Sequence, residues 1–580
     1  MSRERPFILF LPQYSHRIGF GHLKRSQALS SILARDFKTL ILPYPLHKED
    51  EKHFQDPRLK YIVLDHRYYS KTDVKRLSAF SGLVLIDSPQ TFHTKKKAVY
   101  INSSTPIQYK FLRPNQFLYT GLTCLPLAPL LREHLKKKDF GGKGIFIGFG
   151  NTDPNELSLK ALKYLEQAGI RKAVTLNIGG HFKPGYKVQL KEYIKKNFPG
   201  CVITENVKSI IPHLFRNGYL ITSFSITALE AMMMNKKTAL LNHSPYHTFL
   251  SRRFNRLFYL GTYRRTPGFL VRKRLKKFFA SFSPLPVRSS GFISNNQNLV
   301  RIFRSSGSPG PVTRCPVCGS GKIQTVLREH RRQMNHCASC RSKFLDPGKG
   351  ERKRPRYTKN YFQDEYKDQY GKTYLEDREN ITRLSRERLG LMAGLMPEGV
   401  SEKKLLDIGC AFGFFLEEAG RTGYRTYGIE IEKKAAEYAK NVLKLNVIQG
   451  DFLSRVFKDK FDVMTFWYVF EHFSQPDRIM KKVTSLLTPD GWLCLSLPNG
   501  DGPFYRYNRL EWLQRHPDDH YFDYSVKGLK LFLAGYGLKL KKKRITGFHP
   551  ERYIGLPAFL RPVWKVLHQG DTMELYFNKS

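Results

Sequence analysis

The stretch of sequence that decides the fold reads Leu405-Leu-Asp-Ile-Gly-Cys-Ala-Phe-Gly-Phe-Phe-Leu416. An apolar run that ends in Asp-x-Gly-x-x-x-Gly and continues into a helical pattern predicts a β-strand, a tight turn and a helix. Glycines in such a turn let the backbone pass close to a bound ligand, because they carry no Cβ. The structural alternative is a dinucleotide-binding domain, but that class expects Gly-x-Gly-x-x-Gly.

Acidic residues follow the next two strands of the same alternation. A second apolar strand ends at Glu430, seventeen residues beyond Gly413, and a third strand is followed by Asp451. A carboxylate at the first position can accept hydrogen bonds from both hydroxyls of a ribose. The second carboxylate suits the amino group of adenine.

These motifs resemble class I S-adenosyl-L-methionine (SAM)-dependent methyltransferases over roughly residues 355–580. The resemblance implies a Rossmann-like domain whose glycine turn lies under the methionine part of SAM, with an aspartate that reaches the amino group. The residues expected to bind SAM are Asp407, Gly409, Gly413, Glu430 and Asp451.

Two histidines are candidates for the base that deprotonates the methyl acceptor. His472 follows the fourth predicted strand in Phe-Glu-His, and His520 lies in Asp-Asp-His-Tyr within the insertion on the substrate side. An imidazole suits this role because it titrates near neutral pH. We take His472 as the catalytic candidate and His520 as its rival, and either can equally be a structural hydrogen-bonding residue.

Four of the eight cysteines form two Cys-x-x-Cys pairs, Cys315/Cys318 and Cys337/Cys340, separated by eighteen residues. Two such pairs at this spacing are a signature of a tetrahedral four-thiolate Zn²⁺ site. Four protein ligands leave no open position, so the expected zinc is structural. The ribbon preceding a methyltransferase domain resembles the subgroup that includes deoxysugar C-methyltransferases.

The amino-terminal half alternates short apolar runs with polar helical stretches. Strands are expected at 7–11, 39–42, 61–64 and 83–86, and the alternation restarts near residue 144 with strands at 173–178, 202–204, 219–222 and 238–241. Alternating strands and helices predict parallel sheets covered by helices. The restart predicts two such sheets with a cleft between them.

The loop after the first strand reads Ser15-His-Arg-Ile-Gly-Phe-Gly-His-Leu-Lys-Arg-Ser26. Its glycines allow close approach of a ligand, and the following helix offers a positive amino-terminal end to phosphate. With the later motifs Gly148-Phe-Gly-Asn-Thr-Asp-Pro154 and Ser223-Phe-Ser-Ile-Thr-Ala-Leu-Glu230, it resembles the UDP-sugar hydrolase of pseudaminic acid biosynthesis and the spore-coat-polysaccharide glycosyltransferases. The resemblance covers most of residues 5–260 and implies the glycosyltransferase-B fold.

This resemblance implies that His22 is the catalytic group facing the anomeric carbon, and the alternative is a helix-capping histidine. The residues expected to bind the UDP-linked sugar are Gly19, Gly21, Arg25, Thr227 and Glu230. Arg25 is expected either to neutralise developing phosphate charge or to sit exposed. Phe224 stands where the family prefers glycine, which leaves open a catalytically inactive scaffold.

Charge and composition mark a seam between the two halves. Lys plus Arg number 98 against 49 for Asp plus Glu, a net charge of +49, and no acidic residue lies between Ser251 and Arg314. A basic amphipathic stretch at 271–280 either docks on a neighbouring domain or makes peripheral contact with an anionic membrane. The expected parts are two Rossmann-like domains at 1–140 and 141–262, a linker at 263–312, a zinc ribbon at 313–350 and a methyltransferase at 351–580.

The combined expectation is a bifunctional enzyme of surface-glycan or unusual-sugar biosynthesis. One half handles a UDP-linked sugar, and the other methylates a sugar or a related small molecule. The rival function is a nucleic-acid-modifying methyltransferase, suggested by the basic charge and the ribbon. No apolar run is long enough to span a bilayer and the cysteines do not form a disulfide framework, so we expect a cytoplasmic protein.

Overall fold

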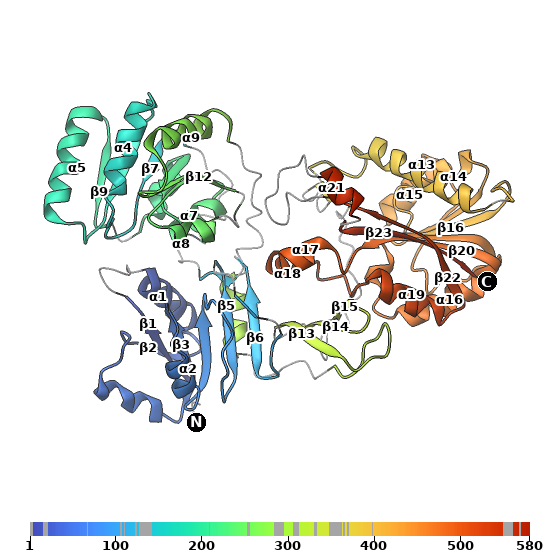
Figure 1. The fold of residues 1–580 in the computed structure, drawn as a ribbon, viewed down its shortest axis with the longest axis horizontal. Helices are drawn as coiled ribbons and strands as arrows, with labels where there is room; N and C mark the ends of the chain where they lie inside the picture. The colour runs from blue at the N-terminus through green and yellow to red at the C-terminus, as the bar shows by residue number, and fades with distance from the viewer. Residues whose placement is uncertain are drawn as a thin grey trace. The chain divides into compact units, whose positions relative to one another are not determined.

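In a computed structural model, the chain divides into two compact units, Met1–Gly307 and Ser308–Ser580, shown in Figure 1. The structure describes residues 4–579 apart from 15–20, 67, 105–106, 110, 122–123, 127–130, 132–141, 208, 252–253, 255, 283–294, 305–311, 330–332, 347–361, 363–365, 368–370, 397, 549–560 and 568–569.

The first unit contains two six-stranded sheets, in the orders β2-β1-β3-β4-β5-β6 and β12-β11-β10-β7-β8-β9. Every pairing in both sheets is parallel. The strands of the first sheet are β1 (Phe7–Pro12), β2 (Lys38–Ile41), β3 (Leu59–Asp65), β4 (Gly82–Ile86), β5 (Ala98–Asn102) and β6 (Gln116–Thr120). Those of the second are β7 (Ile145–Ile147), β8 (Val174–Ile178), β9 (Val202–Glu205), β10 (Tyr219–Thr222), β11 (Lys237–Asn242) and β12 (Leu257–Thr262).

Successive side chains of a strand point to opposite faces of the sheet, and here both sets are apolar. Helices therefore cover both sheets. In the first sheet, Ile8 and Phe10 of β1 pack with Leu29 and Leu33 of α1. In the second sheet, α4, α5 and α9 share one core, and α6, α7 and α8 share the core on the opposite face. The helices are η1 (Lys48–Gln55), α1 (Gly21–Leu33), α2 (Lys71–Leu77), α4 (Leu157–Gln167), α5 (Pro184–Asn197), α6 (Ile211–Arg216), α7 (Ile226–Met233), α8 (Pro245–Ser251), α9 (Gly268–Ser281) and α11 (Asn295–Arg304).

The expected linker at 263–312 contains two packed helices, which corrects that expectation. Helix α9 buries Val271, Leu275 and Phe278 in the core of the second sheet, as the docking alternative predicts. Helix α11 buries Leu299 and Phe303 in the core of the first sheet. In the described part of this stretch, Lys273, Lys276 and Lys277 of α9 are exposed, so basic residues give it the composition of a linker although each helix buries apolar residues in a core. Among the described residues, no helix combines the length and the apolarity that crossing a membrane requires.

The second unit is built on a seven-stranded sheet in the order β18-β17-β16-β19-β20-β23-β22, in which β23 is antiparallel to both neighbours. Its strands are β16 (Lys404–Ile408), β17 (Arg425–Glu430), β18 (Val447–Gln449), β19 (Phe461–Trp467), β20 (Leu487–Pro498), β22 (Leu538–Thr546) and β23 (Thr572–Lys579). The helices are α13 (Arg378–Leu395), α14 (Phe414–Arg421), α15 (Lys433–Asn441), η4 (Phe470–His472), α16 (Pro476–Leu486), α17 (Pro503–Tyr507), α18 (Arg509–Arg515), α19 (Val526–Ala534) and α21 (Arg561–Val566). Helices α13, α14 and α15 cover one face, and α16 and α19 cover the other.

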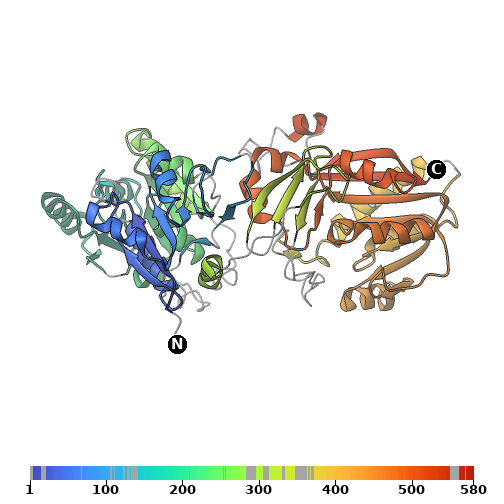
Figure 2. The same cartoon turned by 90° about the horizontal axis from the view of Figure 1, so that it is seen from below.

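The cysteine ribbon is part of this second unit rather than a separate domain, which corrects the expected division at residue 350. Its strands β13 (Ile323–Arg328), β14 (Gln333–Cys337) and β15 (Lys343–Asp346) continue into β21 (Phe522–Asp523) of the methyltransferase region. Phe344 of the ribbon also shares a core with Leu529 of α19. Figure 2 shows the yellow-green ribbon strands against this later part of the chain. The ribbon therefore packs against the methyltransferase region and pairs with it at β21.

Candidate functional sites

The glycine turn after β16 requires glycine at two positions. Gly409 and Gly413 have φ angles of 74° and 85°, a region that disfavours side chains. A Cβ on Gly409 would lie 2.6 Å from the Val469 side chain, and one on Gly413 would lie 2.6 Å from that of Leu445. The turn thus holds the backbone open at the carboxyl end of β16, where the next helix, α14, begins.

Glu430 lies beside this turn at the end of β17. Its carboxylate oxygens accept hydrogen bonds from the backbone N–H of Ala411 at 2.9 Å and of Glu432 at 2.8 Å. Burial raises the pKa of Glu430, and these hydrogen bonds oppose the shift. The carboxylate is therefore held in a fixed orientation, and each oxygen keeps a second lone pair for a ligand.

Asp407, at the penultimate position of β16, is buried and accepts a hydrogen bond of 2.6 Å from the Thr465 hydroxyl. Burial raises the pKa of Asp407 to about 7, although the Thr465 hydrogen bond and the charge of Arg388 lower it. This environment favours binding of a cationic group, because a bound cation would stabilise the carboxylate.

A tyrosine that sequence reasoning missed lies over the same site. Burial raises the pKa of the Tyr374 hydroxyl, and the nearby charges of Asp407 and Glu430 raise it further. The Tyr374 ring stacks on Phe412 and Phe414 of the glycine turn and α14, with centroids 5.6 and 5.8 Å apart. The only sequence feature that pointed to Tyr374 was the aromatic character of the segment before α13. No spacing rule connects that segment to the glycine turn.

Asp451 lies two residues beyond β18, where the prediction placed it. One of its carboxylate oxygens accepts a hydrogen bond of 2.9 Å from the backbone N–H of Leu453. The side chain is half-buried. The structure therefore brings the turn, Glu430 and Asp451 to the carboxyl ends of three adjacent strands, β16, β17 and β18.

His472 and His520 lie together on the substrate side, at a ring-centroid distance of 4.6 Å. His472 Nδ1 lies 3.2 Å from both the backbone carbonyl and a carboxylate oxygen of Asp519. Burial opposes protonation of His472, but Asp519 and Glu471 raise its pKa. For His520, burial and the neighbouring His472 lower the pKa to about 3. The surroundings therefore favour the protonated form of His472 and the neutral form of His520.

The four ribbon cysteines converge on one point. Cys315 and Cys340 place their Sγ atoms 3.8 Å apart, and Cys318 and Cys337 place theirs 3.6 Å apart. These separations are too long for disulfides. They match the edge of about 3.8 Å expected for a tetrahedron of thiolates at about 2.3 Å from Zn²⁺. The donor set fits the expected metal.

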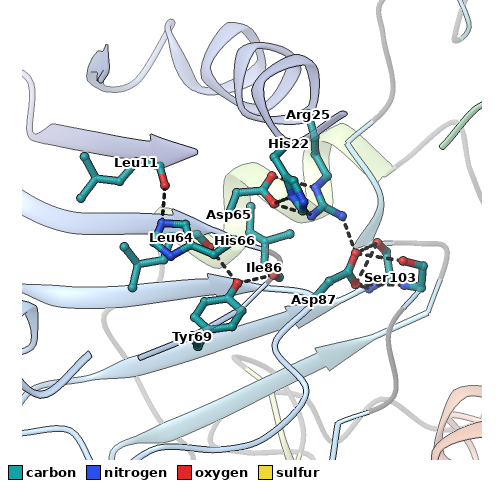
Figure 3. Close-up of polar contacts among 11 residues, drawn as sticks. Leu11, His22, Arg25, Leu64, Asp65, His66, Tyr69, Ile86, Asp87 and Ser103 are labelled. Atoms are coloured by element: carbon teal, nitrogen blue, oxygen red, sulfur yellow. Dashed lines mark hydrogen bonds and ion pairs between the residues drawn. The ribbon is translucent and has the colours of Figure 1, made fainter. Parts of the chain in front are cut away.

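In the first unit, His22 lies at the start of α1 and contacts the buried carboxylate of Asp65, as Figure 3 shows. His22 Nδ1 and an Asp65 oxygen are 2.6 Å apart, and the His22 side chain is 21% exposed whereas Asp65 is fully buried. Burial opposes ionisation of Asp65, but the charge of Arg25 lowers its pKa well below the usual range. An ionised carboxylate can only accept, so Nδ1 of His22 is the donor in this contact.

Arg25 is buried, which contradicts the alternative of an exposed side chain. Its guanidinium is buried and donates to Asp65 at 2.8 and 2.5 Å and to Asp87. Asp87 in turn accepts hydrogen bonds from the backbone N–H groups of Ser103 and Ser104 at 2.9 and 3.0 Å. Arg25 therefore fixes the carboxylates at the ends of β3 and β4, and its expected role in binding the ligand stays a prediction.

Two of the predicted UDP-binding residues, Thr227 and Glu230, lie in the first two turns of α7. Ser225 caps this helix, and Thr227 is half-buried in its first turn. Burial raises the pKa of Glu230 to about 7, while the charge of Lys24 on α1 lowers it. This interaction links the α7 site to the helix that carries His22.

Two further expectations concern glycine and phenylalanine. Gly21 begins α1, and a Cβ there would meet nothing within 4 Å, whereas Gly19 lies outside the described residues.

Phe224 points into the core below α7, where its ring lies 5.5 Å from that of Phe254. The Phe224 side chain is therefore part of the core under α7.

Comparison with known proteins matches residues 374–543 to the family described as "Methyltransferase domain". The ubiquinone biosynthesis O-methyltransferase of Actinobacillus pleuropneumoniae serotype 5b is 31% identical over 112 residues, which are 17% of this chain and 48% of that protein. The enzyme of the same name from Escherichia coli O139:H28 is 26% identical over 187 residues, 29% of this chain and 75% of that protein. The chain thus spans about half the length of the first of these curated relatives.

Among solved structures, a protein described as a putative S-adenosylmethionine dependent methyltransferase from Listeria monocytogenes shares 17% identity at a TM-score of 0.25, over 31% of this chain and 92% of that one. Residues 374–543 of this chain are a class I SAM-dependent methyltransferase domain. Its glycine turn and strand-end carboxylates fit SAM. The family match does not extend to the first unit.

Proposed function

We propose that the chain is a bifunctional enzyme of surface-glycan or unusual-sugar biosynthesis. The second unit methylates a sugar or related small molecule, and the first unit acts on a UDP-linked sugar. The observation that carries the methyltransferase proposal is Glu430, oriented by two backbone N–H groups beside a turn that only glycine allows. When bound, SAM supplies an electrophilic methyl group. Asp407 binds its ammonium group, and Glu430 accepts from its ribose.

Replacing Glu430 by alanine is expected to weaken SAM binding at least about tenfold, because charge-assisted hydrogen bonds contribute about 1.5–3 kcal/mol each. Isothermal calorimetry measures the affinity directly. Glu437→Ala, on the exposed face of α15, is the matched control and should bind SAM as the native protein does. Equal affinity in Glu430→Ala would show that the carboxylate does not contact the ligand.

SAM binding should weaken as the pH falls through about 7, the raised pKa of Asp407. Above this pH the carboxylate is ionised and ready for the ammonium group. Below it, binding must displace a proton, so the affinity should fall by up to about tenfold per pH unit. Calorimetry at about pH 6 and about pH 8 tests this dependence. Asp407→Asn should bind more weakly at high pH and lose most of the slope, and an unchanged slope in that variant would assign the titration elsewhere.

The proposal for the first unit rests on the His22–Asp65 pair and on Glu230. Asp65 orients the imidazole, as a carboxylate does for a general base. His22 then takes the proton of a water molecule or acceptor hydroxyl, whose oxygen forms a bond to C1 of the sugar. The bond between C1 and the diphosphate oxygen breaks, and UDP leaves with the electron pair. The amino-terminal end of α7 favours this developing negative charge.

The glycosyltransferase-B fold is part of the same proposal. It is supported by two parallel sheets in one unit and by the electrostatic interaction between Lys24 of α1 and Glu230 of α7. Turnover in isotopically labelled water distinguishes the acceptors, since a hydrolase places the label on the released sugar and a glycosyltransferase does not. Absence of any UDP binding would contradict the proposal for this unit.

Zn²⁺ bound by the four ribbon cysteines, and a cytoplasmic location in which these thiols stay reduced, complete the proposal. His472 is the proposed group that takes the proton of the methyl acceptor. The alternative of a nucleic-acid-modifying enzyme rests on net charge and the ribbon alone.

A further inference from the structure

Two segments far apart in the sequence are held together on the substrate side of the second unit. The turn η4, which carries Glu471 and His472, follows β19. The backbone N–H of Tyr521 donates to the carbonyl oxygen of Glu471 at 2.9 Å. This hydrogen bond joins η4 to the segment 516–523, which contains His516, His520 and Asp523. Because β21 pairs with β15 of the ribbon, this segment is fixed from both sides.

Glu471 is 1% exposed, and neither of its carboxylate oxygens has a hydrogen-bond partner within the described part of the chain. Burying an ionised carboxylate without a partner is strongly unfavourable, because its contacts with water are lost and nothing replaces them. Protonation removes the charge but leaves an O–H donor without an acceptor, which is also unfavourable. A bound cation would satisfy both the charge and the lone pairs of this side chain.

The surrounding side chains supply further ligand atoms. Glu471, His472 and His520 each offer one ligand atom, and these three atoms lie within 4.8 Å of one another. We propose that these three residues bind one divalent transition-metal cation at the carboxyl end of β19. The site goes beyond the proposed function, since its existence does not depend on SAM or on a methyl acceptor.

The donor set selects the class of cation. Two imidazole nitrogens and one carboxylate favour Zn²⁺, Fe²⁺ or Co²⁺ over Mg²⁺, which prefers oxygen ligands. Three protein ligands leave coordination positions open, as in catalytic rather than structural metal sites. An oxygen of the methyl acceptor is the chemical class of ligand that such an open position takes.

Neighbouring groups orient the proposed ligands. His472 directs Nδ1 at Asp519, with a separation of 3.2 Å to the carboxylate, which is the arrangement in which a carboxylate positions a metal-binding histidine. Nε2 is therefore the ligand atom that we assign to His472. A second group, His516, His520 and Asp523, shares one histidine with the first. In that group, His516 and Asp523 already contact each other at 2.8 Å, so the open ligand set is the one containing Glu471.

The test uses the 580-residue chain with its thiolate metal in place. Titration with Co²⁺, followed by absorption spectroscopy, and with Zn²⁺, followed by calorimetry, should show one added cation per chain. The Co²⁺ spectrum should lack the charge-transfer band that thiolate ligands produce. Glu471→Gln and His520→Gln should each weaken this binding at least about tenfold. Glu511→Gln, on α18 in the same region, is the matched control and should bind as the native protein does.

Asp519 is a positioning residue, because it orients His472. Asp519→Asn should therefore weaken binding of the added cation by about 10–100-fold. Failure of the native protein to bind any added cation would overturn the proposal, as would unchanged binding in both ligand variants. Binding of Mg²⁺ but not of Zn²⁺ or Co²⁺ would overturn the assignment of the cation. SAM affinity, measured on the same samples, should be unchanged in Glu471→Gln. If the native protein does not bind SAM, that result would count against the methyltransferase proposal and not against this metal site.

Discussion

Replacing His22 by alanine is expected to lower turnover of a UDP-linked sugar by a factor of about 10²–10⁴, the usual contribution of a general base. UDP affinity should be nearly unchanged, because His22 acts on the incoming oxygen and the nucleotide is bound at α7. Release of UDP from the sugar measures turnover, and calorimetry measures UDP affinity. Normal turnover in this variant would exclude His22 as the base.

One control and two further variants distinguish a loss of the catalytic step from a loss of folding. His93→Ala removes an exposed histidine from the same sheet region and should leave turnover intact. Asp65→Asn keeps the size of the partner but not its charge, so it should lower turnover and shift its pH dependence without abolishing UDP binding. Glu230→Ala should do the reverse of His22→Ala and weaken UDP binding first. A structural role for His22 alone would change stability in these variants but not the pH dependence.

Serine substitutions at Cys315, Cys318, Cys337 and Cys340 are expected to remove one tightly held Zn²⁺ and to unfold the ribbon. Apparent binding free energies of structural zinc sites are about 10–16 kcal/mol at neutral pH. Because the ribbon shares a core and a sheet with the methyltransferase region, the loss should also lower the thermal stability of the second unit. Metal analysis and thermal unfolding measure the two effects.

Cys201→Ser provides the comparison for this experiment. Cys201 lies in the first unit, half-buried and outside the ribbon, so its replacement should change neither the metal content nor the unfolding of the second unit. A quadruple variant that retains its zinc would show that the metal is bound elsewhere. A native protein without zinc would contradict the four-thiolate assignment altogether.

Local patterns predicted most strands to within two residues. The apolar runs at 7–11 and 219–222 correspond to β1 and β10, since a buried parallel strand must be apolar on both faces. The strands that were missed include β5, β6 and β12. The sequences of β5 and β6, Ala-Val-Tyr-Ile-Asn and Gln-Phe-Leu-Tyr-Thr, are short and include polar residues, so periodicity alone does not separate them from loops.

Composition was a poor guide where basic residues surround a buried stripe. The segment 263–312 carries the charge and the small polar residues of a linker, yet Phe278 and Phe303 are fully buried in two different sheets. A helix needs apolar residues on only one face to pack. Net charge therefore says little about whether such a segment is folded against a domain.

The sequence alone determined the class of the second unit, because a strand, a glycine turn and strand-end acids are local patterns with fixed spacing. It also predicted that the four cysteines of the two pairs would lie together, which the structure confirms. Only the tertiary structure decided which distant residues meet. His22 and Asp65 are 43 residues apart, and Glu471 meets His520 through β21, which the ribbon holds. Such contacts depend on strand order and packing between sheets and helices, and no local spacing encodes them.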